Sequence, residues 1–361
     1  MYRAGVVGLH IGLRHVEGYT GSAATELVAI ADLDAALLDE TGREFDVPAR
    51  YTSLEEMLER ESLDIVSICT PVQLHAPMVI AAAETGAKGV ICEKPITPDM
   101  GSASAMATAC DENNVKLVIG HMRRQLAQFQ RARELIAEGA IGRPTVCTVG
   151  VHQGGLLNQA SHVVDLVRFM LGEPAVEWVV GQVQRETDRY ERGLPIEDLC
   201  MGVITFEGGT RLVLDVDLGA NPTLGDWGFV LTGDAGTLRI TTRRVPGREA
   251  FDLRLVSLSH EDLEVASEDL PDVDPWIAQI DRLAEWIDGG PEHSQSFART
   301  LPSHEALIAI HESARTRTCV TLPVPTRGYP LAAMIEDGQL PIRHPGAYDI
   351  RRPDAYPPAE I

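Results

Sequence analysis

The chain has 361 residues, of which 44% are hydrophobic and 23% charged, and its formal net charge is −22 at pH 7. This balance is typical of a globular protein of about two domains that buries a sizeable core without disulfides. The strong negative charge argues against nucleic acid and anionic membranes as partners, and no apolar run reaches the roughly 18 residues that a membrane span requires.

The first 120 residues alternate short apolar runs with stretches of helical spacing. A capping box, Ser53 to Glu56, opens one of the helices. Strands that alternate with helices predict a doubly wound parallel sheet, the α/β Rossmann fold, with helices on both faces. The predicted strands are 3–8, 26–32, 63–71, 89–95 and 115–120, and the other helical stretches are 34–45 and 76–87.

The stretch GVVGLHIGLRH (5–15) follows the first predicted strand and places Gly8 and Gly12 where a nucleotide-binding loop needs glycines. Asp32 ends the second strand, where a carboxylate accepts the ribose hydroxyls of NAD. Leu33 follows it in place of a basic or hydroxyl residue, which favours NAD over NADP. Taken alone, Asp32 is equally well explained as a helix N-cap. Together, strand, glycine turn, helix, strand and acid within about 30 residues predict a dinucleotide site.

His10 stands where a second glycine is expected, whose missing Cβ normally lets the backbone approach the pyrophosphate. A loop one residue shorter suits this sequence, with Gly8, His10 and Gly12 in the loop and the helix beginning near Ile11. The backbone N–H groups would still point at the phosphates. Two alternatives stay open for the imidazole: it lies over the pyrophosphate and donates to it, or it points to solvent and weakens binding.

Later strands end at the same carboxyl edge, where ligands of such sheets bind. One ends at Thr70-Pro71 and another at Glu93-Lys94-Pro95, and His75 either lies near the nicotinamide or caps its own helix. The predicted cofactor-binding residues are therefore Gly8, His10, Ile11, Gly12, Asp32, Thr70, Pro71, His75, Glu93 and Lys94.

After Gly142 the pattern changes to strands separated by turns, which predicts an α+β domain with a mostly antiparallel open sheet. An amphipathic helix follows at 275–291. The segment 323–361 is rich in proline and cannot form long helices. It is either a disordered tail or a strap that lies on a neighbouring subunit. The predicted strands are 144–153, 177–190, 200–209, 210–219, 227–242 and 251–258.

Three stretches carry a resemblance to a known family: GVICEKPI (89–96), GHMRRQLAQFQRARELIAEGAIGRP (120–144) and GGLLNQASHVVDLVRFMLG (154–172). Together they resemble the Gfo/Idh/MocA oxidoreductases, named for glucose–fructose oxidoreductase and inositol dehydrogenase. The resemblance implies an NAD-binding Rossmann domain at 1–121 and a substrate and oligomerisation domain at 122–322. It also implies a helix at 303–317 that returns to the first domain, and a homo-oligomer, dimer or tetramer.

The resemblance also implies which residues carry the chemistry. The catalytic lysine maps to Lys94 and the catalytic histidine to His162, with Asp165 in a structural role. Asn158 replaces the aspartate that is frequent in the family; an amide cannot take a proton, so it would position a hydroxyl. A histidine suits removal of the hydroxyl proton, and a lysine stabilises the developing alkoxide. The predicted substrate-binding residues are Lys94, Arg123, His152, Gln153, Asn158 and His162.

No cluster of lysine and arginine indicates a phosphorylated substrate, which favours a neutral or mildly acidic sugar, cyclitol or glycoside. The leading prediction is NAD-dependent oxidation of a ring hydroxyl. One alternative is a redox glycosidase that keeps NAD bound through oxidation, elimination and re-reduction. The other, motivated by His10, is a non-catalytic regulator that senses dinucleotide. The six cysteines are scattered without metal-ligand spacing, which predicts no metal site and reduced thiols in the cytoplasm.

Overall fold

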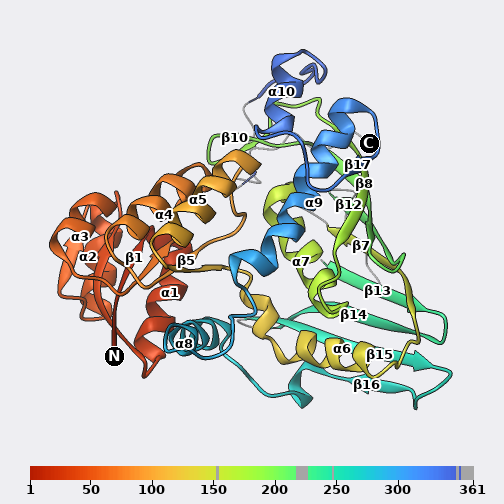
Figure 1. Ribbon diagram of the computed structural model, residues 1–361, viewed down its shortest axis with the longest axis horizontal. Coiled ribbons are helices and arrows are strands. Elements are labelled where there is room, and N and C mark those ends of the chain that lie inside the picture. The colour runs from red at the N-terminus through yellow and green to blue at the C-terminus, as the bar shows by residue number, and fades with distance from the viewer. Residues whose placement is uncertain (152–153, 217–226, 246–247, 347–348, 351–361) are drawn as a thin grey trace. The chain divides into compact units, whose positions relative to one another are not determined.

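The computed structural model describes residues 1–151, 154–216, 227–245, 248–346 and 349–350. The chain divides into two compact units (Figure 1). Unit 1 comprises Met1–Leu126 and Val273–Leu301, and unit 2 comprises Ala127–Asp272 and Pro302–Ile361.

Unit 1 contains a parallel sheet with the strand order β3-β2-β1-β4-β5-β6, which confirms the predicted Rossmann fold. The order reverses between β1 and β4, and this is the point where doubly wound sheets bind ligands. The strands are β1 (Tyr2–Val7), β2 (Thr25–Ala31), β3 (Ala49–Tyr51), β4 (Ile65–Ile68), β5 (Gly89–Cys92) and β6 (Lys116–Ile119). The helices are α1 (Leu9–Gly21), α2 (Ala35–Glu44), α3 (Leu54–Arg60), α4 (His75–Glu84), α5 (Met100–Glu112) and α8 (Pro275–Ile287), with 3₁₀ turns η1 (Val72–Leu74) and η2 (Met122–Gln125).

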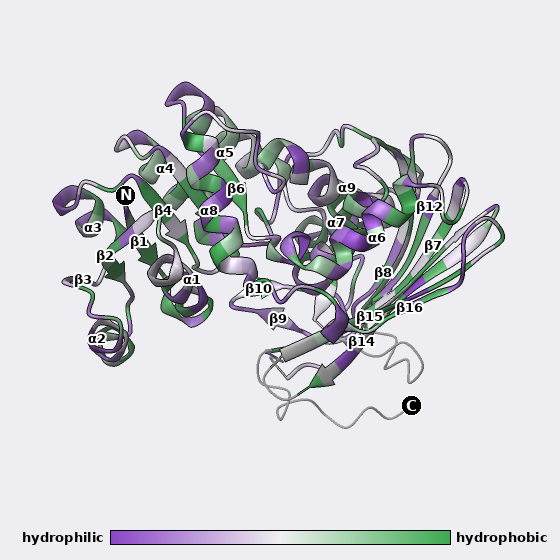
Figure 2. Ribbon diagram, turned by 90° about the horizontal axis from the view of Figure 1, so that it is seen from below, coloured by the Kyte–Doolittle hydropathy of each residue, from purple (hydrophilic) through white to green (hydrophobic). Residues whose placement is uncertain are grey.

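Local sequence explains where these elements begin. Strands β4 and β5 are buried along their whole length, as their continuous apolar runs predict. The last four residues of β1 and of β2 are buried too, and Figure 2 draws both strands with hydrophobic stretches. The Ser53 hydroxyl accepts the Glu56 N–H at 3.1 Å, so the predicted cap of α3 is confirmed. Asp34 accepts the N–H groups of Ala36 and Leu37 and begins α2. Each such cap stabilises its helix by about 1 kcal/mol.

Helix α8 is the segment that returns to unit 1, whereas the expectation gave this part to the helix at 303–317. Helix α8 packs beside α1 (Figure 1), and its Ile280 and Leu283 are buried with the core on that side of the sheet. Beyond α8, Gln295 accepts the Ile119 N–H through its backbone carbonyl at 3.0 Å. These apolar and backbone contacts explain why residues 273–301 belong to unit 1. The sequence-based prediction places them in the second domain, at 122–322.

Unit 2 contains a mostly antiparallel sheet with the order β16-β15-β14-β13-β7-β12-β11-β8-β17, in which β7 and β12 are parallel. This confirms the predicted sheet type. The strands are β7 (Pro144–Val151), β8 (Val176–Gln184), β11 (Leu199–Phe206), β12 (Arg211–Val216), β13 (Trp227–Gly233), β14 (Gly236–Val245), β15 (Arg248–Ser257), β16 (Leu263–Val265) and β17 (Val320–Thr321), with a separate hairpin of β9 (Tyr190–Glu191) and β10 (Leu194–Pro195).

Helices cover one face of this sheet. Phe129 of α6 packs edge-on against Phe229 and Phe251 of the sheet, with ring centroids 5.7 and 5.0 Å apart. Helix α9 packs through Ile310, and a Cβ at Gly181 would lie 2.6 Å from its side chain. The helical elements of this unit are α6 (Ala127–Ala137), the π-helical turn η3 (Gly155–Gln159), α7 (Ala160–Met170), η4 (Ser267–Asp269), α9 (Phe297–Thr316), which begins in unit 1, and α10 (Pro330–Glu336).

The residues that follow β17, 323–350, form what we call the C-terminal segment. Its helix α10 is short, as the prolines predict. The described part lies on its own chain, where Arg343 and His344 donate their N–H groups to the carbonyl of Glu186 at 2.7 and 2.9 Å. This part is therefore a strap on its own unit, and contact of the segment with a neighbouring subunit, one of the two expectations, stays a prediction.

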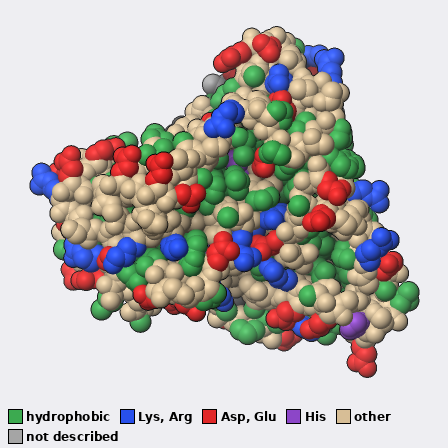
Figure 3. All heavy atoms as spheres, in the orientation of Figure 1, with side chains coloured by type: hydrophobic (Ala, Val, Ile, Leu, Met, Phe, Trp, Pro, Cys, Tyr) green, Lys and Arg blue, Asp and Glu red, His purple; other side chains and the backbone are tan. Residues whose placement is uncertain are grey.

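On the face drawn in Figure 3, acidic and basic side chains are interspersed. Among the described residues, no helix combines the length and hydropathy that crossing a bilayer requires. No cluster of metal-ligating side chains is found in the described part of the chain either. Five cysteines, at 69, 92, 110, 147 and 200, are buried, and Cys319 is exposed.

Candidate active site

The carboxyl edge of the unit 1 sheet is held by backbone hydrogen bonds that continue past the strand ends. Gly8 N–H donates to Ala31 O at 2.9 Å, and Glu93 N–H donates to Ile68 O at 2.9 Å. The Cys69 and Gly120 N–H groups make equivalent bonds at 2.9 and 2.8 Å. The segments that carry the predicted cofactor-binding residues are therefore fixed side by side along one edge.

The two predicted glycines have different structural reasons. Gly8 has φ +85°, and a Cβ there would lie 2.7 Å from the Cys69 carbonyl oxygen, so the tight turn after β1 requires glycine. At Gly12, a Cβ would lie 3.0 Å from the Val6 side chain, so this glycine lets α1 pack closely on the sheet. These are the roles of the first and last glycines in a dinucleotide-binding turn.

Helix α1 begins at Leu9, two residues before the predicted start near Ile11. His10 and Ile11 therefore belong to its first turn, and both side chains are exposed. The first N–H groups of a helix lack intrahelical partners and attract an anion such as a phosphate. This location fits a pyrophosphate, and both alternatives for the His10 imidazole stay open.

Asp32 connects two elements at this edge. Its Oδ2 accepts the Leu9 N–H at 2.6 Å, and its Oδ1 accepts the Asp34 N–H at 2.8 Å. The N-cap of α2 is Asp34, so the alternative reading of Asp32 as a helix N-cap is excluded. The half-buried carboxylate at the end of β2 fits the ribose hydroxyls of a dinucleotide, and Leu33 beside it is 89% exposed.

Glu93, directly before Lys94, lies in a buried polar network. Its Oε1 is 3.1 Å from Nε2 of His15, whose Nδ1 is 3.0 Å from the Ser67 hydroxyl. Burial raises the pKa of a carboxyl group, but the hydrogen bond and charge of His15 outweigh burial, and the pKa of Glu93 lies below its usual range. A Cβ at Gly120 would lie 2.6 Å from Oε1 of Glu93, so glycine there leaves room for the carboxylate. Lys94 is thus attached to a rigid, ionised anchor and is itself half-buried.

His75 connects the loops after β4 and β5. Its Nδ1 is 2.9 Å from the Pro95 carbonyl oxygen, and its Nε2 is 3.0 Å from the Thr70 carbonyl oxygen. The ring is 1% exposed, and burial holds the pKa of His75 below its usual range. These contacts give His75 a role as a cross-link between the Thr70-Pro71 and Lys94-Pro95 segments. Its contact with a cofactor stays a prediction.

Arg123 and its neighbour Arg124 lie in η2 of unit 1. Arg124 is fully buried, and its guanidinium donates to the Ser294 carbonyl at 2.5 Å. Arg124 is therefore structural. Arg123 is half-buried, and its predicted substrate contact remains a prediction.

In unit 2, the π-helical turn η3 leads directly into α7. Gly154 has φ +112°, and a Cβ there would clash with the Gln159 side chain, so the chain enters the turn through glycine. Asn158 lies in this turn, and its Nδ2 donates to Glu191 Oε1 at 3.0 Å. The Ser161 hydroxyl donates to the Asn158 carbonyl at 2.6 Å. Such π-helical turns are frequent at functional sites.

His162 follows one turn later, in α7, and is 5% exposed. Its ring lies against Trp227 at the start of β13, with centroids 5.7 Å apart and an interplanar angle of 36°. Asp165, on the same helix, is fully buried. Trp227 therefore forms one wall around the predicted catalytic imidazole.

A buried carboxylate–histidine contact supports the backbone of the π-helical turn. Glu197 Oε1 accepts the Leu156 N–H at 2.6 Å, and Glu197 Oε2 is 3.1 Å from His311 Nε2. Burial raises the pKa of a carboxyl group, but the His311 hydrogen bond outweighs it and holds the pKa of Glu197 below its usual range. The sequence offers no signal for this pair, because its members are 114 residues apart.

The structure thus groups the predicted site residues in two sets. Gly8, Gly12, Asp32 and the segments at 70–71 and 93–94 share the sheet edge of unit 1, while Asn158 and His162 share consecutive helical turns in unit 2. His152 and Gln153 lie outside the described residues. The approach of Lys94 to His162 remains a prediction.

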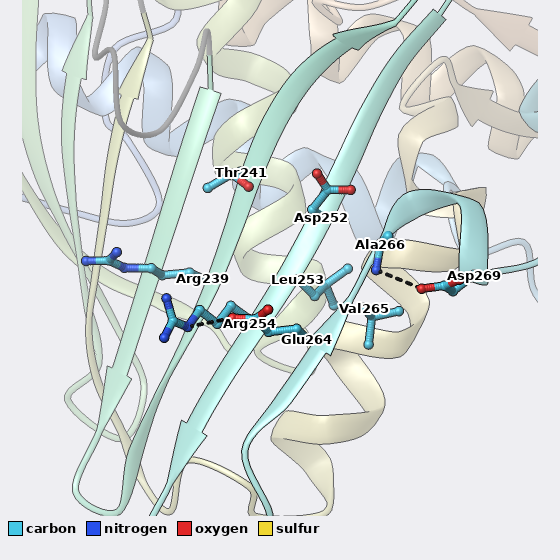
Figure 4. Close-up of a pocket in the computed structure, with 9 residues that line it drawn as sticks. All are labelled: Arg239, Thr241, Asp252, Leu253, Arg254, Glu264, Val265, Ala266 and Asp269. Carbon is cyan, nitrogen blue, oxygen red and sulfur yellow. Dashed lines mark hydrogen bonds and ion pairs between the residues drawn. The ribbon is translucent and has the colours of Figure 1, made fainter.

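A shallow pocket on the outer face of β14, β15 and β16 does not belong to the site (Figure 4). None of the predicted functional residues lines it. Arg254 pairs there with Glu264 at 3.2 Å, with both side chains more than half exposed. Exposed pairs of this kind are ordinary surface chemistry.

Both units match models of one family. Residues 2–121 match the oxidoreductase family with an NAD-binding Rossmann fold, and residues 151–239 match the GFO/IDH/MocA C-terminal domain. Myo-inositol 2-dehydrogenase of Thermotoga maritima is 28% identical over 228 residues, which cover 59% of this chain and 67% of that protein. D-xylose 1-dehydrogenase (NADP(+)) 2 of Haloferax volcanii is 25% identical over 332 residues, which cover 86% of this chain and 97% of that protein.

A solved structure shares the fold of this chain. A levoglucosan dehydrogenase in complex with NADH and levoglucosan has a TM-score of 0.75 and 22% identity, and the match covers 89% of this chain and 99% of the other. The family models cover the glycine turn, Asp32, Lys94, Asn158 and His162. The chain therefore belongs to the Gfo/Idh/MocA family of oxidoreductases.

Proposed function

We propose that this enzyme oxidises a ring hydroxyl of a sugar, sugar derivative or cyclitol with NAD as the hydride acceptor. The observation that carries the proposal is the common sheet edge of unit 1, which carries the glycine turn and Asp32 at one part and Lys94, next to the anchored Glu93, at another. Support comes from relatives named as inositol and xylose dehydrogenases. Buried His162 in α7 supplies the second functional group.

The residues of this chain divide the work as follows. The first turn of α1 binds the pyrophosphate through its N–H groups, and Asp32 accepts the ribose hydroxyls. Bound NAD supplies the acceptor for the hydride at C4 of its nicotinamide. His162 removes the proton from the substrate hydroxyl as a general base. The Lys94 ammonium stabilises the negative charge that develops on the same oxygen, and Asn158 positions another hydroxyl.

Asp32 also supports the choice of NAD. A carboxylate repels the 2′-phosphate of NADP, and exposed Leu33 offers it no hydrogen-bond donor from its side chain. One relative is named for NADP(+), so relatives do not decide this point. The half-buried position of Asp32 at the end of β2 favours NAD for this chain.

The test is a screen of hexoses, pentoses, sugar acids, cyclitols and aryl glycosides with NAD⁺ and NADP⁺. We expect at least one polyol to yield NADH, detected by its absorbance, with NAD⁺ preferred. Release of the aglycone without net NADH would instead support the redox glycosidase. Absence of turnover across the panel, despite tight NADH binding, would contradict a dehydrogenase and support the regulator.

A further inference from the structure

The contact between Asn158 and Glu191 determines which end of the amide faces away from the carboxylate. Asn158 Nδ2 donates to Glu191 Oε1 at 3.0 Å, and both side chains belong to unit 2. An ionised carboxylate only accepts hydrogen bonds, whereas an amide has one donating and one accepting end. Glu191 therefore retains the NH₂ end of Asn158 and turns its carbonyl oxygen to the other side.

The backbone under Asn158 cannot easily shift to change this orientation. The π-helical turn is held through Leu156, whose N–H donates to the fully buried Glu197 at 2.6 Å. The Asn158 carbonyl accepts the Ser161 hydroxyl at 2.6 Å. The amide is thus presented from a supported turn, about one helical turn before His162.

The backbone next to Glu191 is held by the C-terminal segment. Gly346 N–H donates to the Asp188 carboxylate at 2.9 and 3.1 Å, and Ile350 N–H donates to the Tyr190 carbonyl at 3.1 Å. The hydroxyl of Tyr329 donates to the Pro195 carbonyl at 3.0 Å on the other strand of the hairpin. The strap on this unit therefore fixes the hairpin that carries Glu191.

We infer that Glu191 is a positioning residue that determines substrate specificity, because it makes Asn158 offer a hydrogen-bond acceptor to a second hydroxyl of the polyol. The inference rests on the proposed function and deepens it. A substrate with a free, donating hydroxyl at that position binds, and the analogue that carries hydrogen or O-methyl there binds weakly. A group to which an amide NH₂ must donate, such as a ketone, is disfavoured at the same position.

The test is a double-mutant cycle of Asn158→Asp, Glu191→Gln and both together. Asn158→Asp alone places two carboxylates in contact, and we expect KM for the polyol to rise about 10-fold or more, as for loss of a charge-assisted hydrogen bond. Glu191→Gln alone lets the amide flip and raises KM several-fold. The double variant restores a donor opposite an acceptor, because the introduced glutamine amide donates to the introduced aspartate, and its KM returns close to that of the wild type.

Two measurements separate this inference from the proposed reaction. KM is taken from NADH formation, and polyol affinity is taken separately from the fluorescence of the enzyme–NADH complex. If KM or polyol affinity returns towards the wild-type value in the double variant, the Asn158–Glu191 hydrogen bond is supported. The affinity measurement gives this answer even if no NADH forms. Equal KM and affinity in wild type, Asn158→Asp and the double variant would overturn the inference, with turnover still supporting the dehydrogenase. Glu264→Gln, which removes a carboxylate from a surface ion pair, is the matched control and should leave both values unchanged.

Discussion

The backbone N–H of Leu9 donates to the Asp32 carboxylate at 2.6 Å, so the first helix and the end of the second strand share one side chain. Asp32 therefore holds the backbone directly after the glycine turn, in addition to its expected contact with the ribose. Replacing it removes both functions, and the two effects need separate measurements.

For Asp32→Ala, we expect NADH affinity to fall about 10- to 100-fold, the range for loss of hydrogen bonds to a charged group. NADPH affinity falls less, because the repelling carboxylate is gone, and thermal stability also decreases. Asp32→Asn keeps an acceptor for Leu9 and should retain stability better than Asp32→Ala. Fluorescence titrations with NADH and NADPH give the ratio; an unchanged ratio in Asp32→Ala would limit Asp32 to a structural role.

Lys94→Ala should lower turnover by at least about 100-fold, the range for loss of an electrostatic or acid–base group. NADH binding should remain, since the glycine turn and Asp32 are intact. Lys88→Ala is the matched control, because Lys88 is an exposed lysine paired with Asp64, and its turnover should stay normal. A normal rate for Lys94→Ala would remove this lysine from the mechanism.

His162→Ala should also reduce turnover sharply, because the substrate hydroxyl loses its base. The loss should be partly relieved at high pH, where hydroxide and the hydroxyl itself supply the missing deprotonation. Initial rates over a pH series check both points. An unchanged rate at neutral pH would mean that another group takes the proton.

The sequence predicts the architecture of unit 1 well, because its buried strands and capped helices carry local signals. Apolar runs mark β1, β2, β4, β5 and β6, and the Ser53 cap is visible as a tetrapeptide. The short strand β3 was missed because three residues carry no periodicity. In unit 2 the prediction extended the strand at 177–190 past Gln184, although the chain there bends into the separate hairpin.

The site shows the limit of local signals more clearly. Gly8, Asp32 and Lys94 belong to local motifs, and the sequence alone therefore predicts them as site residues. It does not predict Glu191, Glu197 or His311, because each contacts a partner that is distant in sequence. The sequence also does not predict that residues 273–301 belong to unit 1. The pattern of an amphipathic helix shows that one face is apolar, but it does not show against which domain that face packs.

His15→Leu should strongly destabilise the fold, because Glu93 would stay buried without its partner. Loss of one member of a buried pair costs roughly 3–5 kcal/mol, so we expect a clear drop in the denaturation midpoint. Adding Glu93→Gln should recover part of that loss, since a neutral amide needs no counter-charge. His260→Leu, at an exposed position, is the control. Equal midpoints for wild type and His15→Leu would show that the network adds little.

His293 predicts an acid-sensitive step in stability. Its Nδ1 accepts the Gln295 N–H at 2.9 Å, so a second proton on this ring would face a donor. Burial lowers the pKa of His293 from 6.5 to about 4. Below pH 6.5 the unfolded chain takes up a proton that the folded chain refuses, so stability decreases as pH falls from 6.5 towards 4. The loss amounts to about 3 kcal/mol for a shift of this size.

Unfolding of the wild type and of His293→Asn between pH 7 and 4 checks this prediction. The Asn side chain keeps an acceptor near Gln295 and does not titrate, so its stability should fall less over this range. His260→Asn removes an exposed histidine and should follow the wild type. Parallel curves for the wild type and His293→Asn would contradict the assignment.

Because five of the six cysteines are buried and one is exposed, reaction of the thiols with a reagent reports unfolding of this protein. Burial raises the pKa of Cys69, Cys92 and Cys147, and that of Cys110 to about 12, so these groups stay protonated and shielded from reagents. Cys319 alone is exposed. A maleimide dye should therefore label the native chain once, at Cys319 just after α9. Slow labelling of the five buried cysteines would then measure how often the cores of the two units open to solvent.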